Sequence, residues 1–369
     1  MRARPRVFVT DASYPHALAA IRALGKAGFA VTAAERENVP AYEVVGFWSR
    51  YCSGRVRYPD PRGDDQRTAA ALAQHFAAAE YDVVLPVGLE MTSLFVRHRD
   101  ALDAPVMLPA DDAFAVAADK RRTFALAESL GMPVPRTVPL EAWREIPLPV
   151  VFKHLRKGAS IAVTATEAER IATSLQKKRD EYVVQEFIPG ENGFGYFGFF
   201  ENGVEQAYFM HERLMQIPKE GGPSVVARSV RDEELHRLGK TLLETLRWNG
   251  VAMVEFKRSD RDGRFYLMEV NPKFWGSLDL AIQSGCNFPA WVADAVLHRE
   301  PLRFFGYDEN LTYQFVIPNG LKCFLRYPDF RKRFLHNAVS KDVRTDMRLD
   351  DPFPAAAGLF SMAMNAVTQ

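Results

Sequence analysis

The chain has 369 residues, of which 47% are hydrophobic and 25% are charged, and its formal net charge is +1. This composition is typical of a globular protein with two or three subdomains, and the near-zero charge gives no overall attraction to nucleic acid or to a membrane surface. The three cysteines lie far apart without a CxxC spacing, which argues against a zinc site or a disulfide framework. No apolar run approaches the ~20 residues of a membrane span, and the N-terminal run VFV is too short for a signal peptide. We therefore expect a cytoplasmic protein.

Residues 1–115 alternate between strand and helix patterns. The runs RVFVT at 6–10 and FAVTA at 29–33 have the composition of buried strands, and the segment at 17–28 between them has helical periodicity. A further helix and a further strand follow before residue 90. This alternation predicts a doubly wound, parallel α/β domain.

The first turn of this domain, TDASYPH, lacks the GxGxxG pattern of dinucleotide-binding domains. Glu35 follows the second strand, where an acid can hold a ribose hydroxyl. Without the glycines, we interpret Glu35 as a solvated loop residue, because a fold alone does not specify a function.

The pattern changes to α+β after residue 116. A helix is predicted at 120–130, and strand and helix patterns alternate up to residue 190. From about residue 195, aromatic-rich runs separated by turn residues predict a larger antiparallel sheet. We expect a small lobe at 116–190, a large lobe at 191–300, and a C-terminal extension at 301–369 to which the sequence assigns no role.

The segment at 250–277 carries the most specific chemistry. Two apolar runs flank the polar turn RSDRDGR, which predicts a β-hairpin with Glu255 on one strand and Glu269 and Asn271 on the other. Glutamates are uncommon in apolar strands unless they are paired or bind metal, and oxygen ligands of this kind suit Mg²⁺. The alternative is a solvated sheet face on which lysines alternate with these acids.

Two lysines precede this hairpin at places where they can reach phosphate groups. Lys153 ends the apolar run PVVFK and is followed by the loop HLRKGAS, whose backbone amides up to Ser160 are further donors. Lys120 begins a predicted helix in a charged run. Taken alone, each is better explained as a surface lysine.

The segment VQEFIPGEN has the features of an adenine-binding strand end. The strand breaks at a Pro-Gly pair, which exposes backbone groups of Gln185 and Glu186, while Phe187 and Ile188 supply an apolar wall. Glu191, just past the turn, is placed to accept hydrogen bonds from ribose hydroxyls. The alternative is a plain strand and turn with solvated acids.

Two arginines flank the glycine-rich segment KEGGPS. Arg213 precedes it and Arg228 follows it, and guanidinium groups bind phosphate or carboxylate in a bidentate manner. The glycines predict a loop that closes over a reaction centre. Solvated arginines beside an irregular loop are the alternative.

Taken in order, five segments resemble the ATP-grasp superfamily, in particular its carboxylate–amine ligase branch and carbamoyl-phosphate-synthase-like ATP-grasp domains. They are DK at 119–120, PVVFK ending at Lys153, VQEFIPGE at 184–191, GVAMVEFK around Glu255, and MEVNPKFWGS around Glu269 and Asn271. The order and spacing of all five argue against coincidence. The resemblance implies a preATP-grasp domain followed by two α+β lobes that clamp ATP.

The resemblance also implies roles for individual residues. ATP phosphates would contact Lys120, Lys153 and the loop up to Ser160, and adenine and ribose would contact Gln185, Glu186, Phe187, Ile188 and Glu191. Magnesium, with manganese as a substitute, would bind Glu255, Glu269 and Asn271. The catalytic cations would be Arg213, Arg228 and Lys273, the last at a position where many relatives carry arginine.

The implied reaction joins a carboxylate to an amine, or to a thiol, through an acyl phosphate, with release of ADP and phosphate. Its substrates would be small molecules, and Ser13, Tyr14 and Glu90 of the first domain would line their site. Glu90, Glu212 or His211 would be the base that keeps the amine neutral. No nucleic acid or membrane partner is expected, and the resemblance is compatible with a homodimer.

Three other functions remain open from the residues alone. A carboxylase or carbamoyl-phosphate-type enzyme would activate bicarbonate. A non-catalytic ATP sensor would have little need for a full set of metal ligands. An RNA-binding protein would use the basic-aromatic segment FLRYPDFRKRFLH at 324–336.

Overall fold

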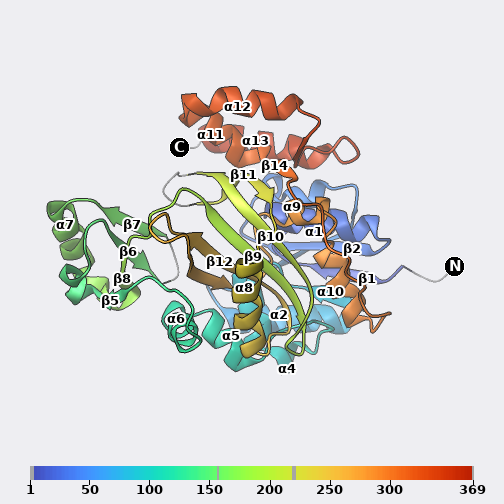
Figure 1. Ribbon diagram of the computed structural model, residues 1–369. Helices are drawn as coiled ribbons and strands as arrows, with labels where there is room; N and C mark the ends of the chain where they lie inside the picture. Colours follow the sequence, from blue (N-terminus) through green and yellow to red (C-terminus); the bar gives the residue numbers. More distant parts are fainter. Residues whose placement is uncertain (1–3, 156–157, 218–221, 368–369) are drawn as a thin grey trace.

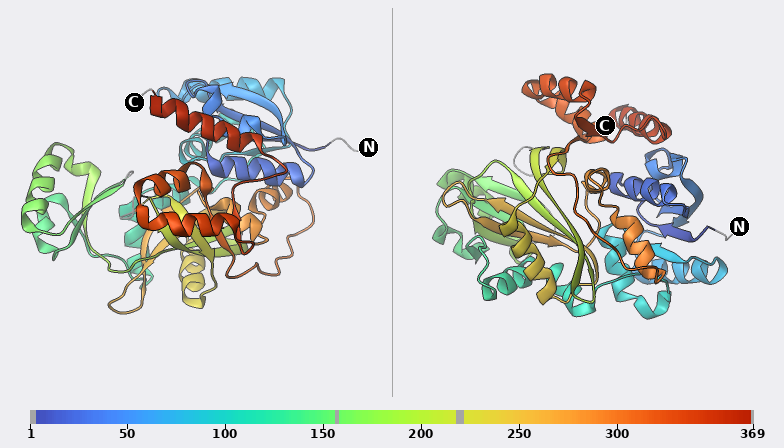
Figure 2. Two further views of the ribbon diagram at one scale, coloured as in Figure 1. Left: turned by 90° about the horizontal axis from the view of Figure 1, so that it is seen from above. Right: turned by 45° about the vertical axis from the view of Figure 1, so that its right-hand side comes forward.

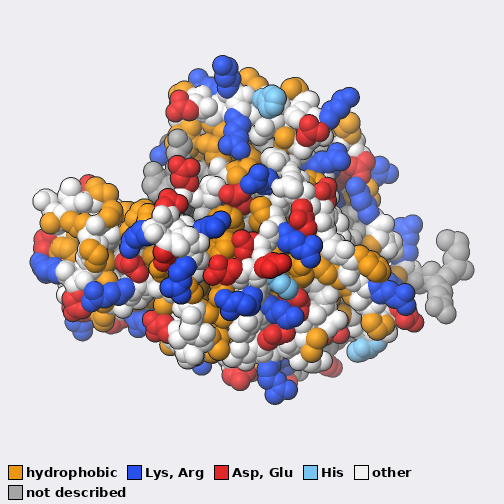
Figure 3. All heavy atoms as spheres, viewed as in Figure 1, with side chains coloured by type: hydrophobic (Ala, Val, Ile, Leu, Met, Phe, Trp, Pro, Cys, Tyr) orange, Lys and Arg blue, Asp and Glu red, His pale blue; other side chains and the backbone are white. Residues whose placement is uncertain are grey.

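The computed structural model describes residues 4–155, 158–217 and 222–367. Within these ranges the strands form one seven-stranded sheet and two four-stranded sheets (Figure 1). No helix in the described part of the chain is both long and apolar enough to cross a membrane. Charged side chains of both signs are interspersed over the face shown in Figure 3.

The first domain contains a parallel sheet with strand order β3-β2-β1-β4. Its strands are β1 (Arg6–Val9), β2 (Ala30–Arg36), β3 (Cys52–Tyr58) and β4 (Val83–Leu85). Its helices are α1 (Pro15–Lys26), η1 (Ala41–Glu43), η2 (Val45–Trp48), α2 (Asp65–Ala78), α3 (Leu89–Arg97), α4 (Arg99–Leu102) and α5 (Asp111–Ala117). Val7 and Val9 belong to one buried cluster and Phe8 to another. Both faces of the sheet are therefore covered, as a doubly wound parallel sheet requires, and the predicted fold class is confirmed.

The small lobe contains an antiparallel sheet with strand order β5-β8-β6-β7. Its elements are α6 (Lys120–Ser129), β5 (Thr137–Pro139), η3 (Leu140–Glu145), β6 (Val150–His154), β7 (Ala159–Ala162), α7 (Ala165–Leu175), η4 (Gln176–Glu181) and β8 (Tyr182–Glu186). Val150 and Phe152 are buried and pack with Ala168 and Ala172 of α7. Because side chains alternate along a strand, Lys153 points away from this core.

The large lobe is built on an antiparallel platform with strand order β13-β12-β9-β10-β11, extended by β14 and β15. Its elements are β9 (Gly193–Glu201), β10 (Val204–Gln216), β11 (Ser224–Ser229), α8 (Glu233–Thr245), β12 (Gly250–Arg258), β13 (Phe265–Asn271), α9 (Leu278–Gln283), α10 (Phe288–Val296), β14 (Thr312–Gln314) and β15 (Val343–Thr345). The platform continues past residue 300, where we expected the large lobe to end, because β14 pairs with β11 and β15 pairs with β14.

The remaining C-terminal helices lie over the edge of the platform and the first domain. They are η5 (Val316–Gly320), α11 (Leu321–Arg326), α12 (Pro328–Val339) and α13 (Phe353–Val367). Helix α13 contacts η1, η2 and η5, and the view from above shows it crossing the first domain (Figure 2). A buried ion pair fixes this arrangement, because Arg22 Nε of α1 lies 2.8 Å from Asp351 Oδ2 just before α13.

Candidate active site

The predicted hairpin at 250–277 forms as β12 and β13. Glu255 lies directly opposite Glu269 in the register, and Met253 lies opposite Asn271. Because alternate residues share a face of a sheet, the two glutamates and the asparagine lie on one face. The sequence therefore predicted both the hairpin and the cross-strand acid pair correctly.

The small lobe supplies a cation to this acidic pair. Lys120 is the first residue of α6, where Asp119 caps the helix with hydrogen bonds from two backbone amides. Its Nζ lies 2.9 Å from Glu269 Oε2 and also donates to Leu155 O at 3.1 Å. Asn271 Nδ2 donates to Glu269 Oε1 at 2.8 Å. Both carboxylate oxygens of Glu269 thus have a hydrogen-bonding or ion-pair partner.

Lys153 approaches the hairpin from β6. Its Nζ donates to Met268 O on β13 at 2.9 Å. Burial, together with the charge of Lys120, lowers the pKa of Lys153, although Glu269 acts in the opposite direction. The group is therefore an incompletely solvated cation, and a bound anion would stabilise it.

The pKa of Glu269 reflects the same cluster. Burial acts to raise it, but the ammonium groups of Lys120 and Lys153 and the hydrogen bond from Asn271 hold the pKa of Glu269 below its ordinary value. The glutamate is thus held as a carboxylate in a largely desolvated place. An ionised carboxylate of this kind is what a hard metal cation requires.

Arg213 reaches Glu255 across an intervening strand. Strand β9 lies between β10 and β12, and its Gly193 and Gly195 stand opposite Arg213 and Glu255, respectively. A Cβ at Gly193 would meet the guanidinium carbon at 3.8 Å. Across this strand, Arg213 Nη2 lies 3.1 Å from Glu255 Oε2.

Arg228 lies one strand further from the hairpin. Its Nη2 is 2.6 Å from Glu212 Oε2 on β10, and Asn192 Nδ2 donates to the other oxygen of Glu212 at 2.7 Å. Residues 218–221 lie outside the described residues, and they include the first three residues of the expected closing loop KEGGPS between Arg213 and Arg228. Arg228 is thus on the same platform as Arg213, but it contacts a different acid.

The residues expected around adenine lie at the end of β8 and just after it. Gln185 is buried, its side chain donates to Thr137 Oγ1 at 2.8 Å, and in the sheet it lies between Thr137 of β5 and Val151 of β6. Glu186 accepts a hydrogen bond from Arg136 N at 3.0 Å and another from Arg261 Nη1 at 3.3 Å.

The rest of this predicted set forms a wall and a rim. Ile188 is buried, and Lys257 Nζ lies 4.7 Å from the centre of the Phe187 ring. Arg261 Nη2 donates to Phe187 O. Glu191, after the turn, and Ser160, on β7, are exposed. Phe187 and Ile188 therefore form an apolar wall, and Lys257 and Arg261 lie beside Phe187. Ser160 and Glu191 are exposed to solvent outside this wall.

Lys273 connects the hairpin with the first domain. Burial lowers its pKa, whereas Glu269, Glu90, Asp11 and Glu255 act to raise it. Its Nζ donates to Phe274 O at 3.1 Å. The lysine thus lies in the electrostatic field of acids from both parts of the protein.

Ser13, Tyr14 and Glu90 lie at the C-terminal ends of the parallel strands, where open sheets bind ligands. Ser13 N donates to Glu35 Oε2 at 2.7 Å. Glu35 is completely buried and also accepts from Arg36 N at 2.9 Å. Our interpretation of Glu35 as a solvated loop residue was wrong, because this carboxylate organises the turn after β1.

Sequence reasoning missed Asp11, which follows β1 directly. Its Oδ2 accepts hydrogen bonds from Gly88 N at 2.7 Å and from Thr10 Oγ1 at 2.5 Å. Burial raises the pKa of Asp11 to about 6, and the charges of Glu35 and Glu90 add to this. Its place at the end of a parallel strand was the available signal.

The candidate bases differ in their surroundings. His211 is buried and bonds Ser277 Oγ through Nδ1 at 3.0 Å, and burial followed by the charge of Arg213 holds its pKa well below the usual range. Glu212 is paired with Arg228, whereas Glu90 on α3 is exposed.

The hairpin face fits a magnesium ion that is bound mainly by ATP and water. In the described ranges no three His, Cys, Asp or Glu side chains gather closely enough to hold a metal by themselves. Glu255, Glu269 and Asn271 offer hard oxygen donors on paired strands. Mg²⁺ commonly uses one or two carboxylates and completes its shell with water and phosphate oxygens.

Comparison with known proteins shows which fold the chain shares and which proteins it resembles. Residues 208–315 match the family model described as ATP-grasp in the biosynthetic pathway with Ter operon. A D-aspartate ligase of Enterococcus faecium is 24% identical over 188 residues, which cover 47% of this chain and 43% of that ligase. The matched part thus spans less than half the length of this relative.

Solved structures extend the likeness over most of the chain. The L-amino acid ligase of Bacillus licheniformis has a TM-score of 0.64 and 16% identity, covering 85% of this chain and 79% of that chain. The biotin carboxylase domain of Hydrogenobacter thermophilus 2-oxoglutarate carboxylase, determined with MgADP, ADP and bicarbonate, has a TM-score of 0.65 and 14% identity, covering 84% and 73%. The protein therefore has the ATP-grasp fold.

Proposed function

We propose that the protein is an ADP-forming ligase that joins a carboxylate to an amine through an acyl phosphate. The main support for this proposal is a cluster of charged residues at which the small lobe and the large lobe meet. Lys120 and Lys153 of the small lobe contact Glu269 and the backbone of Met268 on the large lobe. A cluster of this kind, between lobes that share the ATP-grasp fold, suits ATP bound through its phosphates.

The cations of the cluster are suited to the phosphates of ATP. Burial of Lys153 and Lys273 lowers the pKa of each, so both ammonium groups lack much of their water shell. An entering phosphate chain would restore the missing interactions, and fixed charges in a desolvated site stabilise developing charge more strongly than water does. Lys120 and Lys153 would hold phosphate oxygens, as expected from the family resemblance.

The acids would hold Mg²⁺ at the same place. Glu255, Glu269 and Asn271 are its proposed ligands, and when bound it would neutralise phosphate charge and orient the phosphoryl group. Arg213, now paired with Glu255 at 3.1 Å, would be released when that carboxylate binds the cation. Its guanidinium would then be free to bind the transferred phosphoryl group or the carboxylate substrate.

The reaction needs positioning and charge neutralisation from these residues, without an enzyme nucleophile. The substrate carboxylate attacks the γ-phosphorus, the bond to ADP breaks, and an acyl phosphate forms. The neutral amine then attacks the acyl carbon and expels phosphate. Arg213, Arg228 and Lys273 are the proposed catalytic cations, and Glu90, which is exposed on α3, is one of the candidate bases for the amine.

ADP release measured against pairs of substrates tests this proposal. The assay supplies Mg²⁺ and ATP with amino acids or other small carboxylates and amines, each alone and in combination, and identifies products by mass. A ligase releases ADP only when both partners are present. ADP release with bicarbonate as the sole carboxylate would instead indicate bicarbonate activation, and ATP binding without any turnover would indicate a sensor.

A further inference from the structure

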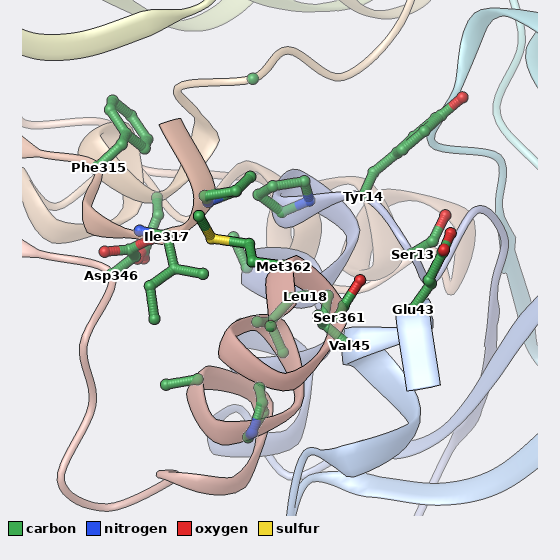
Figure 4. Close-up of a pocket in the computed structure, with 18 of the residues that line it drawn as sticks. Ser13, Tyr14, Leu18, Glu43, Val45, Phe315, Ile317, Asp346, Ser361 and Met362 are labelled. Carbon is green, nitrogen blue, oxygen red and sulfur yellow. Dashed lines mark hydrogen bonds between the residues drawn. The ribbon is translucent and has the colours of Figure 1, made fainter. Parts of the chain in front are cut away.

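A cavity of about 630 Å³ lies between the first domain and the C-terminal segment, outside the Lys120–Glu269 cluster. Its walls come from α1, η1 and η2 on one side and from η5, the segment after β15 and α13 on the other. Figure 4 shows Ser13, Tyr14 and Glu43 at one end and Phe315, Ile317 and Asp346 at the opposite end.

The middle of the cavity is apolar. Leu18 and Val45 of the first domain face Met362 of α13 across it, and Ile317 and Phe315 extend the apolar wall toward Asp346 (Figure 4). Such a surface favours a ligand with a hydrocarbon or aromatic body, since burial of apolar area is the main source of affinity in a concave site.

The far end of the cavity carries an acid without a cationic partner. Asp346 accepts hydrogen bonds from Val316 N at 2.8 Å and from Ile317 N at 3.1 Å. Within the described ranges no lysine, arginine or histidine forms an ion pair with it. Burial raises the pKa of Asp346 to about 6, and the nearby charge of Asp279 adds to this. An ammonium group of a ligand would supply the missing countercharge.

The other charges of the lining are largely satisfied by the protein. Arg22 pairs with Asp351, Arg36 pairs with Glu35, and Asp279 pairs with Arg348 at 2.9 Å. Glu43 lies at the opposite end of the cavity from Asp346, and Lys322 is exposed at its rim. Among the charged side chains of this lining in the described part of the chain, Asp346 therefore combines burial of its carboxylate with the lack of an ion pair.

The opposite end leads toward the candidate active site. Ser13 and Tyr14 line the cavity, and the charges of Asp11 and Glu90 help burial to raise the pKa of the Tyr14 hydroxyl. Glu90 and Asp11 in turn act on Lys273. A ligand that fills the cavity thus has one end near Asp346 and its other end beside the acids that surround Lys273.

We propose that this cavity binds an amphipathic primary amine, with its apolar body between α1 and α13 and its ammonium group against Asp346. If the proposed function holds, this molecule is one of the two substrates, and it carries its reacting group, a carboxylate or a second amine, at the end that lies past Ser13 and Tyr14. The C-terminal segment then has a defined role, because η5, Asp346 and α13 form the wall that recognises the substrate. The buried pair of Arg22 and Asp351 holds that wall in place.

The first test is direct binding of butylamine, hexylamine and octylamine by calorimetry, with ATP absent. We expect affinity to rise about fourfold for each added methylene, since burial of one CH₂ contributes about 0.8 kcal/mol. Hexanoate should bind at least about tenfold more weakly than hexylamine, because it would place a second anion near Asp346. Equal binding of hexylamine and hexanoate would overturn the proposal.

Variants locate the binding. Ser361→Trp fills the cavity from α13 and should weaken hexylamine at least about tenfold, whereas Leu359→Trp, on the exposed side of the same helix, should change it less than twofold. Asp346→Asn should weaken hexylamine about tenfold, and Glu43→Gln should leave it within about twofold. Equal effects of the two tryptophans, or a larger effect at Glu43 than at Asp346, would contradict the assignment.

The binding assay is independent of the proposed chemistry. Because it contains no ATP, loss of binding would overturn the cavity assignment while ADP release remained. Conversely, a protein that never releases ADP would disprove the ligase proposal, while selective amine binding would still support the cavity. Thermal melting of each variant confirms that it is folded.

Discussion

Lys120 Nζ lies 2.9 Å from Glu269 Oε2, and this contact joins the start of α6 to a strand of the large-lobe platform. Asn271 holds the other oxygen of the same carboxylate at 2.8 Å. The cations and acids of the proposed site are therefore paired to each other in the structure. On binding, phosphates would take over the cations and Mg²⁺ would take over the acids.

The first prediction concerns Glu269. Glu269→Gln keeps the shape of the side chain but removes its charge, and it should lower ADP release on the order of 100-fold or more, because fixed charge at the reacting phosphoryl group is lost. Asp260→Asn, in the exposed turn of the same hairpin, is the matched control and should change the rate less than twofold. If Glu269→Gln released ADP as fast as the parent protein, the assignment of Glu269 as a magnesium ligand would be contradicted.

The second prediction separates function from stability at Lys153. Burial lowers the pKa of this lysine, so the unfolded chain binds more protons than the folded chain between the lowered pKa and 10.5, and stability rises with pH through that window. Lys153→Met removes the free-energy cost of burying the charged ammonium group at neutral pH. We expect an equal or higher melting temperature at pH 7, together with ATP binding weakened about 10- to 100-fold.

Calorimetric titration with Mg·ATP and thermal melting of the same preparation check both parts. Lys240→Met serves as the control and should leave ATP affinity within about twofold, because this lysine lies on α8 and pairs with Glu205 and Glu244 instead of the proposed site. A large loss of stability in Lys153→Met with ATP affinity intact would show a structural lysine.

Much of the site was predictable because its signals are local. Two apolar runs joined by a polar turn specify a hairpin, and the turn length then places Glu255 opposite Glu269. Lys120 follows Asp119, a helix-capping residue, so its position at the start of a helix was also readable.

Other parts depend on contacts that no local pattern records. The pairing of Arg213 with Glu255 depends on β9 lying between their strands. Strands β14 and β15 have three residues each and obtain their pairing from the edge of a distant sheet. The cavity beside α13 arises only when this helix is brought against the first domain, and Asp346 looks in the sequence like an ordinary loop acid.

The third prediction concerns the pH dependence of stability at Asp11. Burial raises the pKa of Asp11 from 3.8 to about 6, so the folded chain binds more protons between these values. The stability that the folded state gains from binding a proton at Asp11 is therefore fully present below about pH 4 and is lost as the pH rises through about 6. Asp11→Asn should remove this dependence.

Urea unfolding of the parent protein and of Asp11→Asn at pH 4.5 and pH 7.5 measures the effect. The stability of the variant relative to the parent should be higher at pH 7.5 than at pH 4.5. Asp100→Asn, an exposed acid on α4, is the control. An equal difference at both pH values would show that Asp11 titrates as an ordinary carboxyl.

The fourth prediction concerns the attachment of the C-terminal segment. Arg22 and Asp351 form an almost completely buried ion pair, and Asp351 also accepts hydrogen bonds from Ser49 Oγ and Arg50 N, each at 2.8 Å. Asp351→Asn leaves the Arg22 charge buried without its partner. We expect a loss of about 3–5 kcal/mol in the free energy of unfolding.

Urea unfolding checks this loss, and limited proteolysis reports whether α13 becomes accessible. Asp350→Asn is the matched control, because its ion pair with Lys26 is exposed and should contribute less than about 1 kcal/mol. Similar losses in both variants would show that the buried pair does not anchor α13.

The most direct test of the central proposal is ADP release by the intact protein with Mg²⁺ and ATP, with carboxylate and amine candidates supplied separately and together. The proposed ligase activity predicts ADP and an amide product only when both partners are present, with loss on the order of 100-fold or more in Glu269→Gln. ADP formed at the same rate without an amine, or by Glu269→Gln as readily as by the parent protein, would contradict it.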